Sequence, residues 1–295
     1  MKRFIALIAA LIASFGSFNA TARQQVKKTD DHSLLWRISG KGLAKPSYLF
    51  GTIHIICKDD YLWTGKMKES LTKSDKVCFE MDITDPTVMM QVAAGMIDKN
   101  GKQLKDYFTP AQYKLLEQYM KDSIGMSLSL LVSMNPVFLQ TVMEIKKMVT
   151  CTDPTSYEET ISGIAVKDHK KVAGLETPQE QIAALETIPT DSVIKAITDQ
   201  LQGTGEDGIA VYEQMLAAYK RQDLPALYNL ITTSPGAGED MGPLLDERNK
   251  KWIARMQETM IGSSVFFAVG AGHLYGPKGV ITLLRKEGYN VDALR

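Results

Sequence analysis

The chain has 295 residues, of which 44% are hydrophobic and 23% are charged, so it is able to bury a substantial core. Basic and acidic residues both number 34, which gives a formal net charge of 0 at pH 7. This charge balance, without clustered Lys and Arg, argues against a nucleic-acid binder. We therefore expect a globular protein that does not bind nucleic acid.

The first 22 residues have the features of a secretory signal peptide. Lys2 and Arg3 form a basic start, the apolar run FIALIAALIASF follows, and Ala20-Thr21-Ala22 is an A-x-A cleavage site. The apolar run is shorter than the roughly 20 residues that span a bilayer. We expect an exported protein, periplasmic or secreted, that begins near Arg23 and keeps no stable membrane anchor. Cleavage removes two basic residues and no acidic one, so the net charge becomes −2.

Three cysteines are present, an odd number for an oxidising compartment. Cys78 lies within KVCFEM, which is typical of a buried strand, and is expected to be a free core thiol. Cys57 and Cys151 are both expected in loops, where they could form a disulfide. The sequence leaves this pairing open, because it depends on the separation of the two Cα atoms.

Two β-rich runs stand near the start of the mature chain, SYLFGTIHI (47–55) and KVCFEMDI (76–83). They bracket the short amphipathic segment GKMKESLTKS (65–74). This strand–helix–strand pattern predicts two parallel strands.

A helical region is expected from about Pro86 to Asp168. Two helices in it start with an N-cap residue followed by proline, Thr109 with Pro110 and Asn135 with Pro136. The run KKVAGLE (170–176) predicts a third strand. Further helices are expected over 177–188, 190–201, 207–223, 223–231 and 244–261, with a loop rich in Gly and Pro at 234–243.

The end of the chain returns to the strand pattern. SSVFFAVG (263–270) predicts a buried strand, PKGVITLLRKEGYNV (277–291) a helix that ends at Gly288, and the last residues an edge strand. Strands near both ends with helices between them predict an α/β fold, a mostly parallel sheet flanked by helices. We expect a single domain over 23–295, with a large helical subdomain inserted within about 86–168 and 178–262.

Two of the four histidines follow strand-like runs in the same frame, Gly51-x-x-His54 and Gly270-x-x-His273. In open α/β sheets, ligands bind beyond the carboxyl ends of the strands. Glycine in each motif should let the backbone turn sharply and approach a ligand closely. Glu80 holds the matching position after its strand, and Asp82 follows on the same face. Imidazole with carboxylate suits a catalytic divalent metal such as zinc.

The plainer interpretations remain open. Each histidine could be a hydrogen-bonded loop residue, and Glu80 could be a core carboxylate paired to Lys or Arg. The other two histidines, His32 and His169, lie in polar segments and are expected at the surface.

The end of the chain also contains a partial dinucleotide fingerprint. Gly270, Gly272 and Gly276 follow a strand, and Asp292 comes twenty residues after Gly272. Only three residues follow Asp292, and an exported protein has little access to NAD. We therefore do not favour dinucleotide binding.

The segments GTIH, FEMD, GLETPQEQ, DERNKKW and GAGHLYGPKGVITLLRKEGYNV, in this order, resemble the TraB/GumN family, which includes the Tiki metalloproteases. The resemblance spans nearly the whole mature chain and implies the fold of the erythromycin-esterase-like and ChaN-like superfamily. It implies an active centre of His54, His273 and Glu80. It further implies supporting site residues in Glu176, Arg248 and Asn249.

From the residues alone, Glu176 could instead cap the helix that begins near Pro178. Arg248 could pair with Asp246 or Glu247 on the surface. Both interpretations stay open at this stage.

The candidate residues together with the resemblance imply two possible functions. The first is a metal-dependent hydrolase, a Tiki-like peptidase acting on a peptide or small-molecule substrate. The two histidines would hold a divalent ion of the zinc, manganese or cobalt class, and Glu80 would be a ligand or the general base. Glu176 would fill the other role, and Arg248 would stabilise an oxyanion. The alternative is a non-catalytic metal- or haem-binding protein on the same scaffold.

Overall fold

The computed structural model describes residues 32–204, 208–233 and 241–295. The predicted signal peptide and most of the loop predicted at 234–243 lie outside these ranges. Within them, no helix is both long enough and apolar enough to cross a membrane.

A six-stranded mixed sheet forms the centre of the fold, in the order β6-β4-β7-β2-β1-β8. The four strands from β6 to β2 are parallel to one another, and β1 is antiparallel to both of its neighbours. The predicted mostly parallel α/β sheet is therefore confirmed. Its strands are β1 (Leu35–Ser39), β2 (Ser47–Thr52), β4 (Lys76–Phe79), β6 (Lys171–Gly174), β7 (Val265–Gly270) and β8 (Asn290–Leu294).

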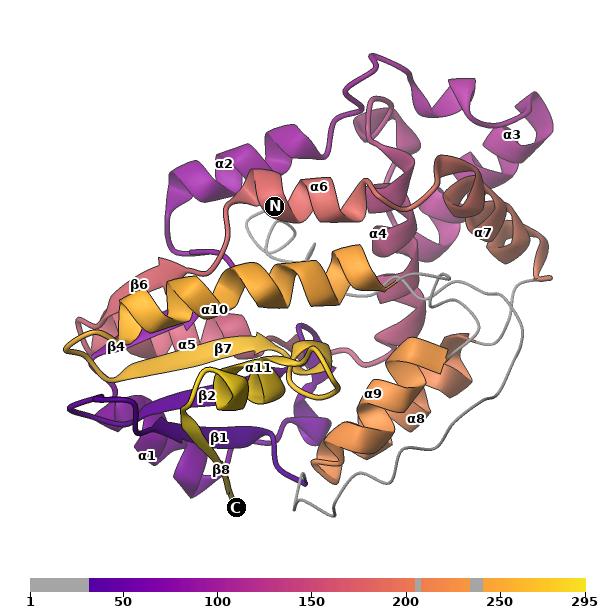
Figure 1. The fold of residues 1–295 in the computed structure, drawn as a ribbon. Coiled ribbons are helices and arrows are strands. Elements are labelled where there is room, and N and C mark those ends of the chain that lie inside the picture. Colours follow the sequence, from indigo (N-terminus) through magenta and orange to yellow (C-terminus); the bar gives the residue numbers. More distant parts are fainter. Residues whose placement is uncertain (1–31, 205–207, 234–240) are drawn as a thin grey trace.

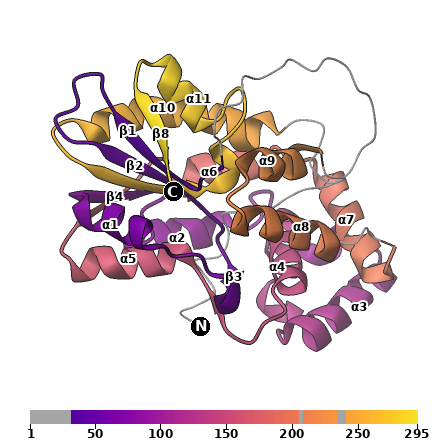
Figure 2. The same ribbon diagram turned by 90° about the horizontal axis from the view of Figure 1, so that it is seen from below.

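Helices cover both faces of this sheet (Figures 1 and 2). Helices α10 and α11 lie on one face, and α1 and α5 lie on the other. Central strands β2 and β7 are buried almost along their full length, which fits their apolar sequences. The helices are α1 (Gly65–Lys73), α2 (Pro86–Gly95), α3 (Pro110–Tyr119), α4 (Pro136–Met148), α5 (Tyr157–Lys167), α6 (Pro178–Leu185), α7 (Thr190–Gln202), α8 (Gly208–Lys220), α9 (Leu224–Thr233), α10 (Glu247–Met260) and α11 (Val280–Lys286).

The helix starts inferred from the sequence are confirmed. The side chains of Thr109 and Asn135 accept hydrogen bonds from the first turns of α3 and α4. Gly288 follows α11 with a φ of +90°, a conformation that favours glycine.

A second core lies away from the sheet. It joins α3, α4, α6 and α7 through buried side chains such as Leu116, Phe138, Met143 and Ile197. Figure 2 shows α3, α4 and α7 as a group beside the sheet layers. This group falls within the predicted helical subdomain, whereas α5, α8 and α10 pack their buried side chains against the core of the sheet.

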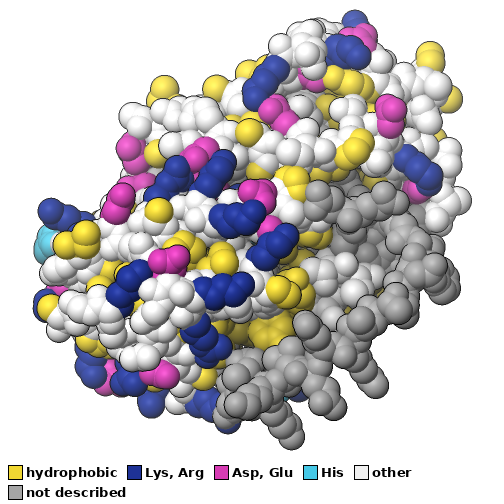
Figure 3. Space-filling model, viewed as in Figure 1, with side chains coloured by type: hydrophobic (Ala, Val, Ile, Leu, Met, Phe, Trp, Pro, Cys, Tyr) yellow, Lys and Arg dark blue, Asp and Glu magenta, His cyan; other side chains and the backbone are white. Residues whose placement is uncertain are grey.

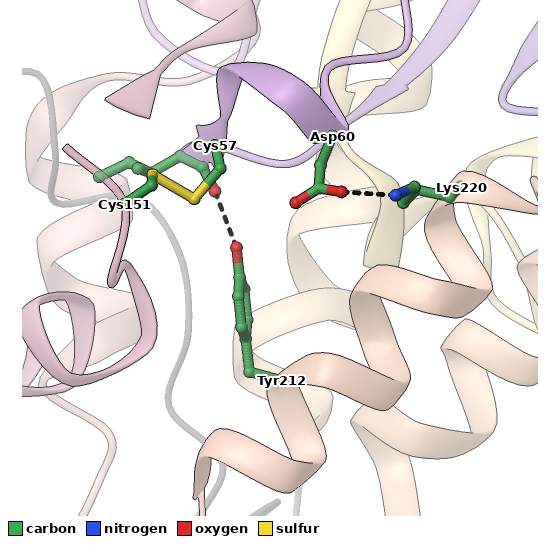
Figure 4. Close-up of a disulfide and its surroundings, with 6 residues drawn as sticks. Cys57, Asp60, Cys151, Tyr212 and Lys220 are labelled. Carbon is green, nitrogen blue, oxygen red and sulfur yellow. Dashed lines mark hydrogen bonds and ion pairs between the residues drawn. A yellow bond between two sulfur atoms is a disulfide. The ribbon is translucent and has the colours of Figure 1, made fainter. Parts of the chain in front are cut away.

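Strand β1 and a small two-stranded sheet were not predicted. The small sheet pairs β3 (Ile56–Cys57) with β5 (Pro154–Thr155), two short strands without an apolar pattern. Cys57 and Cys151 beside it form a disulfide with a Cα–Cα separation of 5.9 Å (Figure 4). Cys78 is a free, buried thiol, as predicted.

Helix α8 is attached to the segment that contains β3. The Tyr212 hydroxyl donates a hydrogen bond to the carbonyl oxygen of Ile55, and Lys220 forms an ion pair with Asp60 (Figure 4). Nearer the sheet, the Tyr219 hydroxyl donates to the carbonyl oxygen of Gly51. These contacts place α8 beside the carboxyl end of β2.

Candidate functional site

The four parallel strands end at the same edge of the sheet, and a predicted site residue follows each of them. His54 follows β2, Glu80 follows β4, Glu176 follows β6 and His273 follows β7. The structure thus brings together side chains that are more than 200 residues apart in the sequence. This is the edge where ligands bind in open α/β sheets.

His54 is held by a carboxylate from α5. Its Nδ1 atom lies 3.0 Å from Oε1 of Glu158, and the Thr52 hydroxyl donates to the same oxygen at 2.6 Å. Burial alone would lower the pKa of His54, but the charge and hydrogen bond of Glu158 outweigh it and raise the pKa to about 9. Burial would raise the pKa of Glu158, but the charge of His54 outweighs this effect and lowers the pKa. With Nδ1 bound to Glu158, Nε2 is the ring nitrogen that faces the site.

His273 is held by α10 in a comparable way. Its Nδ1 atom lies 2.7 Å from Oδ1 of Asn249, whose amide group donates to the backbone oxygens of His273 and Lys278. The ring of Trp252 packs on the imidazole with the ring centroids 4.4 Å apart. Burial, together with the charge of Arg248, lowers the pKa of His273 to about 3. The ring is therefore neutral at pH 7, with the proton on Nδ1 and an electron pair on Nε2 that accepts from Nη1 of Arg248 at 3.1 Å.

Arg248 joins the two buried glutamates. Its Nη2 atom lies 2.6 Å from Oε2 of Glu80 and 2.5 Å from Oε1 of Glu176, and its Nε atom lies 3.0 Å from Oε2 of Glu176. Glu176 also accepts a hydrogen bond from the indole of Trp252. All three charged side chains are at most 12% exposed, so the pairing compensates for their loss of hydration.

These contacts give the two glutamates different proton affinities. Burial would raise the pKa of Glu80, but the positive charge of Arg248 outweighs it, and the pKa falls to about 2. For Glu176, burial and the neighbouring charge of Glu80 outweigh Arg248, and the pKa is raised. Glu80 therefore stays ionised, while Glu176 is the more readily protonated of the two.

Gly270 leaves a small open space at the centre of the site. A Cβ atom added there would lie 3.2 Å from Oε1 of Glu80. It would also lie 3.6 Å from Cδ2 of His273 and 3.7 Å from Nε2 of His54. The space opens into a cavity of about 150 Å³, which is lined by these side chains and by Arg248.

The sequence predicts a sharp turn at the glycine of each motif. Neither Gly51 nor Gly270 has a positive φ. Gly51 instead allows close packing, since a Cβ atom there would lie 3.0–3.1 Å from Leu274 and Ala271 after β7. The expectation of a sharp turn was wrong at Gly51, which lies inside β2, and the close approach to a ligand stays a prediction at both glycines.

The donor chemistry of the site fits a divalent metal, although the present geometry is not that of a formed metal centre. Each histidine has Nδ1 bound to a side-chain oxygen and Nε2 turned inward, as metal-binding histidines do. However, Nε2 of His273 contacts Nη1 of Arg248 at 3.1 Å and lies 3.9 Å from Oε1 of Glu80. Within the described residues, no group of three or more His, Cys, Asp or Glu side chains is arranged to hold a metal ion. Metal binding at this site would require Arg248 to move from His273.

Asp82 does not join the site, contrary to the expectation that it would lie on the same face as Glu80. Its carboxylate accepts hydrogen bonds from the backbone and hydroxyl of Thr84. The alternation of side chains ends with β4 at Phe79, because the chain bends at Glu80 and Met81.

The alternative roles considered for Glu176 and Arg248 are not observed. Helix α6 is capped by Thr177, together with Glu180 in a capping box. Asp246 pairs with Lys278, and Glu247 pairs with Lys250. The open alternative for Glu80, a buried carboxylate paired with an arginine, is observed, and its partner is Arg248. His32 and His169 are both exposed, as predicted.

Sequence reasoning missed Glu158 and Trp252. Glu158 lies in the first turn of α5, where an acidic residue is explained by the helix dipole alone. The possible link between Cys57 and Cys151 was the only signal available, because the disulfide joins the segment after His54 to the segment before Glu158.

Comparison with known proteins identifies the family. Residues 34–293 match the model of the TraB/PrgY/gumN family, so the chain belongs to this family. It is 23% identical to metalloprotease TIKI1 of Danio rerio over 92% of the chain and 65% of that protein. It is 25% identical to metalloprotease TIKI2 of Danio rerio over 90% of the chain and 62% of that protein. Metalloprotease TIKI1 of Homo sapiens is 24% identical, over 94% of the chain and 64% of its own length.

The chain thus spans less than two thirds of the length of these relatives. No solved structure matches it significantly.

Proposed function

We propose that this protein is an exported metal-dependent hydrolase, and more narrowly a peptidase. One observation carries the proposal: His54, His273 and Glu80 border the same space beside Gly270, and each histidine has Nδ1 held by a side-chain oxygen. Family members named metalloproteases, 23–25% identical over at least 90% of the chain, support the reaction class.

Export is supported by two independent features. One is the signal-like start of the sequence, which lies outside the described residues. The other is the Cys57–Cys151 disulfide, because disulfides persist in oxidising compartments.

In this proposal His54, His273 and Glu80 hold the metal ion. When bound, the ion would polarise the scissile carbonyl and lower the pKa of water. Glu158 and Asn249 fix the ring orientation of the histidines so that each Nε2 faces the centre. Metal binding would displace the proton on Nε2 of His54 and the contact of Arg248 with Nε2 of His273.

The remaining charged groups differ in their ionisation and contacts, which indicates a different role for each of them. Glu80 stays ionised because its pKa is about 2, and this suits a ligand. Glu176 does not line the cavity, and both of its carboxylate oxygens accept hydrogen bonds from Arg248 or Trp252, so it suits the positioning of Arg248 rather than contact with water. Arg248 holds both carboxylates in place, and its Nη1 atom points to the centre at His273. Release of this contact provides an N–H donor for a developing oxyanion.

The haem-binding alternative has less support. The cavity of about 150 Å³ is smaller than the roughly 300–1,000 Å³ of typical cofactor clefts.

Basic and acidic side chains are interspersed on the face seen in Figure 3, and no single charged patch marks a polyanionic partner there.

Metal analysis of the purified mature protein tests the proposal, followed by digestion of a peptide library. The chelated protein is supplied with zinc, manganese or cobalt, and we expect cleavage with at least one ion and none in its absence. Glu80→Gln should abolish cleavage, and Glu159→Gln, an exposed site on α5, should not. Failure of every ion to restore cleavage, or a Soret band after haem addition, would count against the proposal.

A further inference from the structure

Beside the polar centre, the cavity has an apolar wall that the proposed chemistry does not use. We define this wall by its side chains, Leu185, Met215, Leu227, Ile231, Leu244 and Leu245, which come from α6, α8, α9 and the π-helix Gly242–Asp246. Met215 and Leu227 are buried, and the other four are partly buried. Side chains from four separate elements of the fold therefore meet to form one continuous apolar side of the cavity.

Gly272 opens the cavity toward this wall. A Cβ atom added there would lie 3.1 Å from Cδ1 of Ile231 and 3.9 Å from Cδ2 of Leu245. Gly270, two residues earlier, borders the polar centre. The backbone therefore passes from the polar centre to the apolar wall within two residues, which span at most about 7 Å. This is the scale on which a peptide carbonyl and its neighbouring side chain are separated.

The polar side chains that line the cavity are already engaged. Gln181 donates to Glu80, Tyr219 donates to the backbone at Gly51, and Thr52 donates to Glu158. Arg248 is paired with two carboxylates. Among the described lining residues, the wall thus presents no charge for a charged substrate side chain, which would lose hydration there without a partner.

The size of the cavity limits what the wall can receive. An apolar cavity of 150 Å³ holds one benzene molecule, and this cavity measures about 150 Å³. The volume includes the polar centre as well as the space beside the wall. The wall can therefore receive one apolar side chain of the size of Leu, Met or Phe, and not the larger side chain of Trp.

We propose that this apolar wall is a specificity pocket, and that the substrate is a peptide with Leu, Met or Phe directly beside the scissile bond. The inference rests on the proposed peptidase function and names its substrate class. Burial of the three extra carbons of Leu predicts a preference over Ala of roughly 30- to 100-fold in kcat/KM. Charged residues and Trp should be excluded.

A positional-scanning peptide library with the metal-loaded protein tests this preference. Leu, Met and Phe should be selected at one position flanking the cleaved bond. Ile231→Trp fills the cavity and should reduce the preference for Leu over Ala to near unity. Leu245→Ala enlarges the cavity and should admit Trp, which keeps the test decisive if the first variant folds poorly. Ile261→Trp, at a site 75% exposed at the far end of α10, is the matched control and should keep the original preference.

A second measurement separates failure of the pocket from failure of the enzyme. Toluene is added to the metal-free protein, and binding is followed by NMR. Saturable binding that Ile231→Trp removes and Ile261→Trp retains supports the pocket, even if no peptide is cleaved and the proposed function fails. Cleavage without preference at either flanking position, or the absence of toluene binding, would overturn the inference while leaving the peptidase function standing.

Discussion

The Nδ1 atom of His54 lies 3.0 Å from a carboxylate oxygen of Glu158, a residue 104 positions further along the chain. The two residues sit on segments joined by the small β3–β5 sheet and by the Cys57–Cys151 disulfide. Each side chain is 12% exposed, so neither is well solvated. The orientation of one predicted metal ligand therefore depends on a part of the chain that carries no recognisable motif.

The His54–Glu158 pair should make stability depend on pH. The pKa of His54 is raised from 6.5 to about 9, so its contribution is complete below about pH 6.5 and is lost as the pH rises through 9. The pKa of Glu158 is lowered, so its contribution is present above its ordinary value and is lost on acidification. In chelator, Glu158→Gln should cost about 1–3 kcal/mol of unfolding free energy at pH 6, and distinctly less at pH 10.

Urea unfolding at the two pH values measures this difference. Glu159→Gln, an exposed acid on the same turn of α5, is the control and should be nearly neutral at both. An equal loss for Glu158→Gln at pH 6 and pH 10 would show that the charge of His54 does not contribute.

The disulfide should support both the fold and the site. Cys57 and Cys151 are 94 residues apart, and closing a loop of this length stabilises by about 4–5 kcal/mol on the chain-entropy model. The Cys57→Ser/Cys151→Ser variant should lose stability of this order. It should also show a smaller effect of Glu158→Gln, because the two segments are no longer held together. Unfolding of the single and combined variants checks both points. Additive losses would contradict the link between the disulfide and the His54–Glu158 pair.

Gly270→Ala should block the centre of the site without unfolding the protein. The added methyl group would lie 3.2 Å from Oε1 of Glu80 and would fill the space that Nε2 of His54 faces. We expect a loss of activity of about 10²-fold or more, as small displacements at catalytic centres produce. Gly163→Ala is the matched control, because nothing lies within 4 Å of its added Cβ in α5. That change should stabilise by about 0.5–1 kcal/mol and keep activity. Full activity of Gly270→Ala would mean that the reacting atoms lie elsewhere.

The sequence predicted the parts of this structure that depend on local pattern. The apolar runs around Phe50 and Phe267 predicted the central strands β2 and β7. The cap residues Thr109 and Asn135 predicted where α3 and α4 begin. The rule that ligands bind at strand ends led to His54 and His273, because both follow such runs directly. Strand β1 was missed because its five residues lie beside a polar segment, and the β3–β5 sheet was missed because strands of two residues have no periodicity.

The partners of the site residues were less predictable, because they depend on tertiary contacts. The family resemblance pointed to Glu176 and Arg248, yet spacing alone did not show that one arginine bridges Glu80 and Glu176. Asp82 was misplaced because the alternation of side chains in a strand was extended past Phe79, the last residue of β4.

The sharpest prediction concerns the two histidines. If His54 and His273 hold one metal ion, replacing either with Ala should remove bound metal and activity together. The double variant should be scarcely worse than either single variant, because residues that act as a unit are strongly non-additive. His32→Ala and His169→Ala change exposed side chains outside the site and should leave metal content and activity intact.

If the histidines serve only packing and hydrogen bonding, each variant should instead lose stability with unchanged metal content, and the losses should add. Metal analysis and thermal melts with and without chelator distinguish these outcomes. Unchanged metal content in both His54→Ala and His273→Ala would refute a shared metal site.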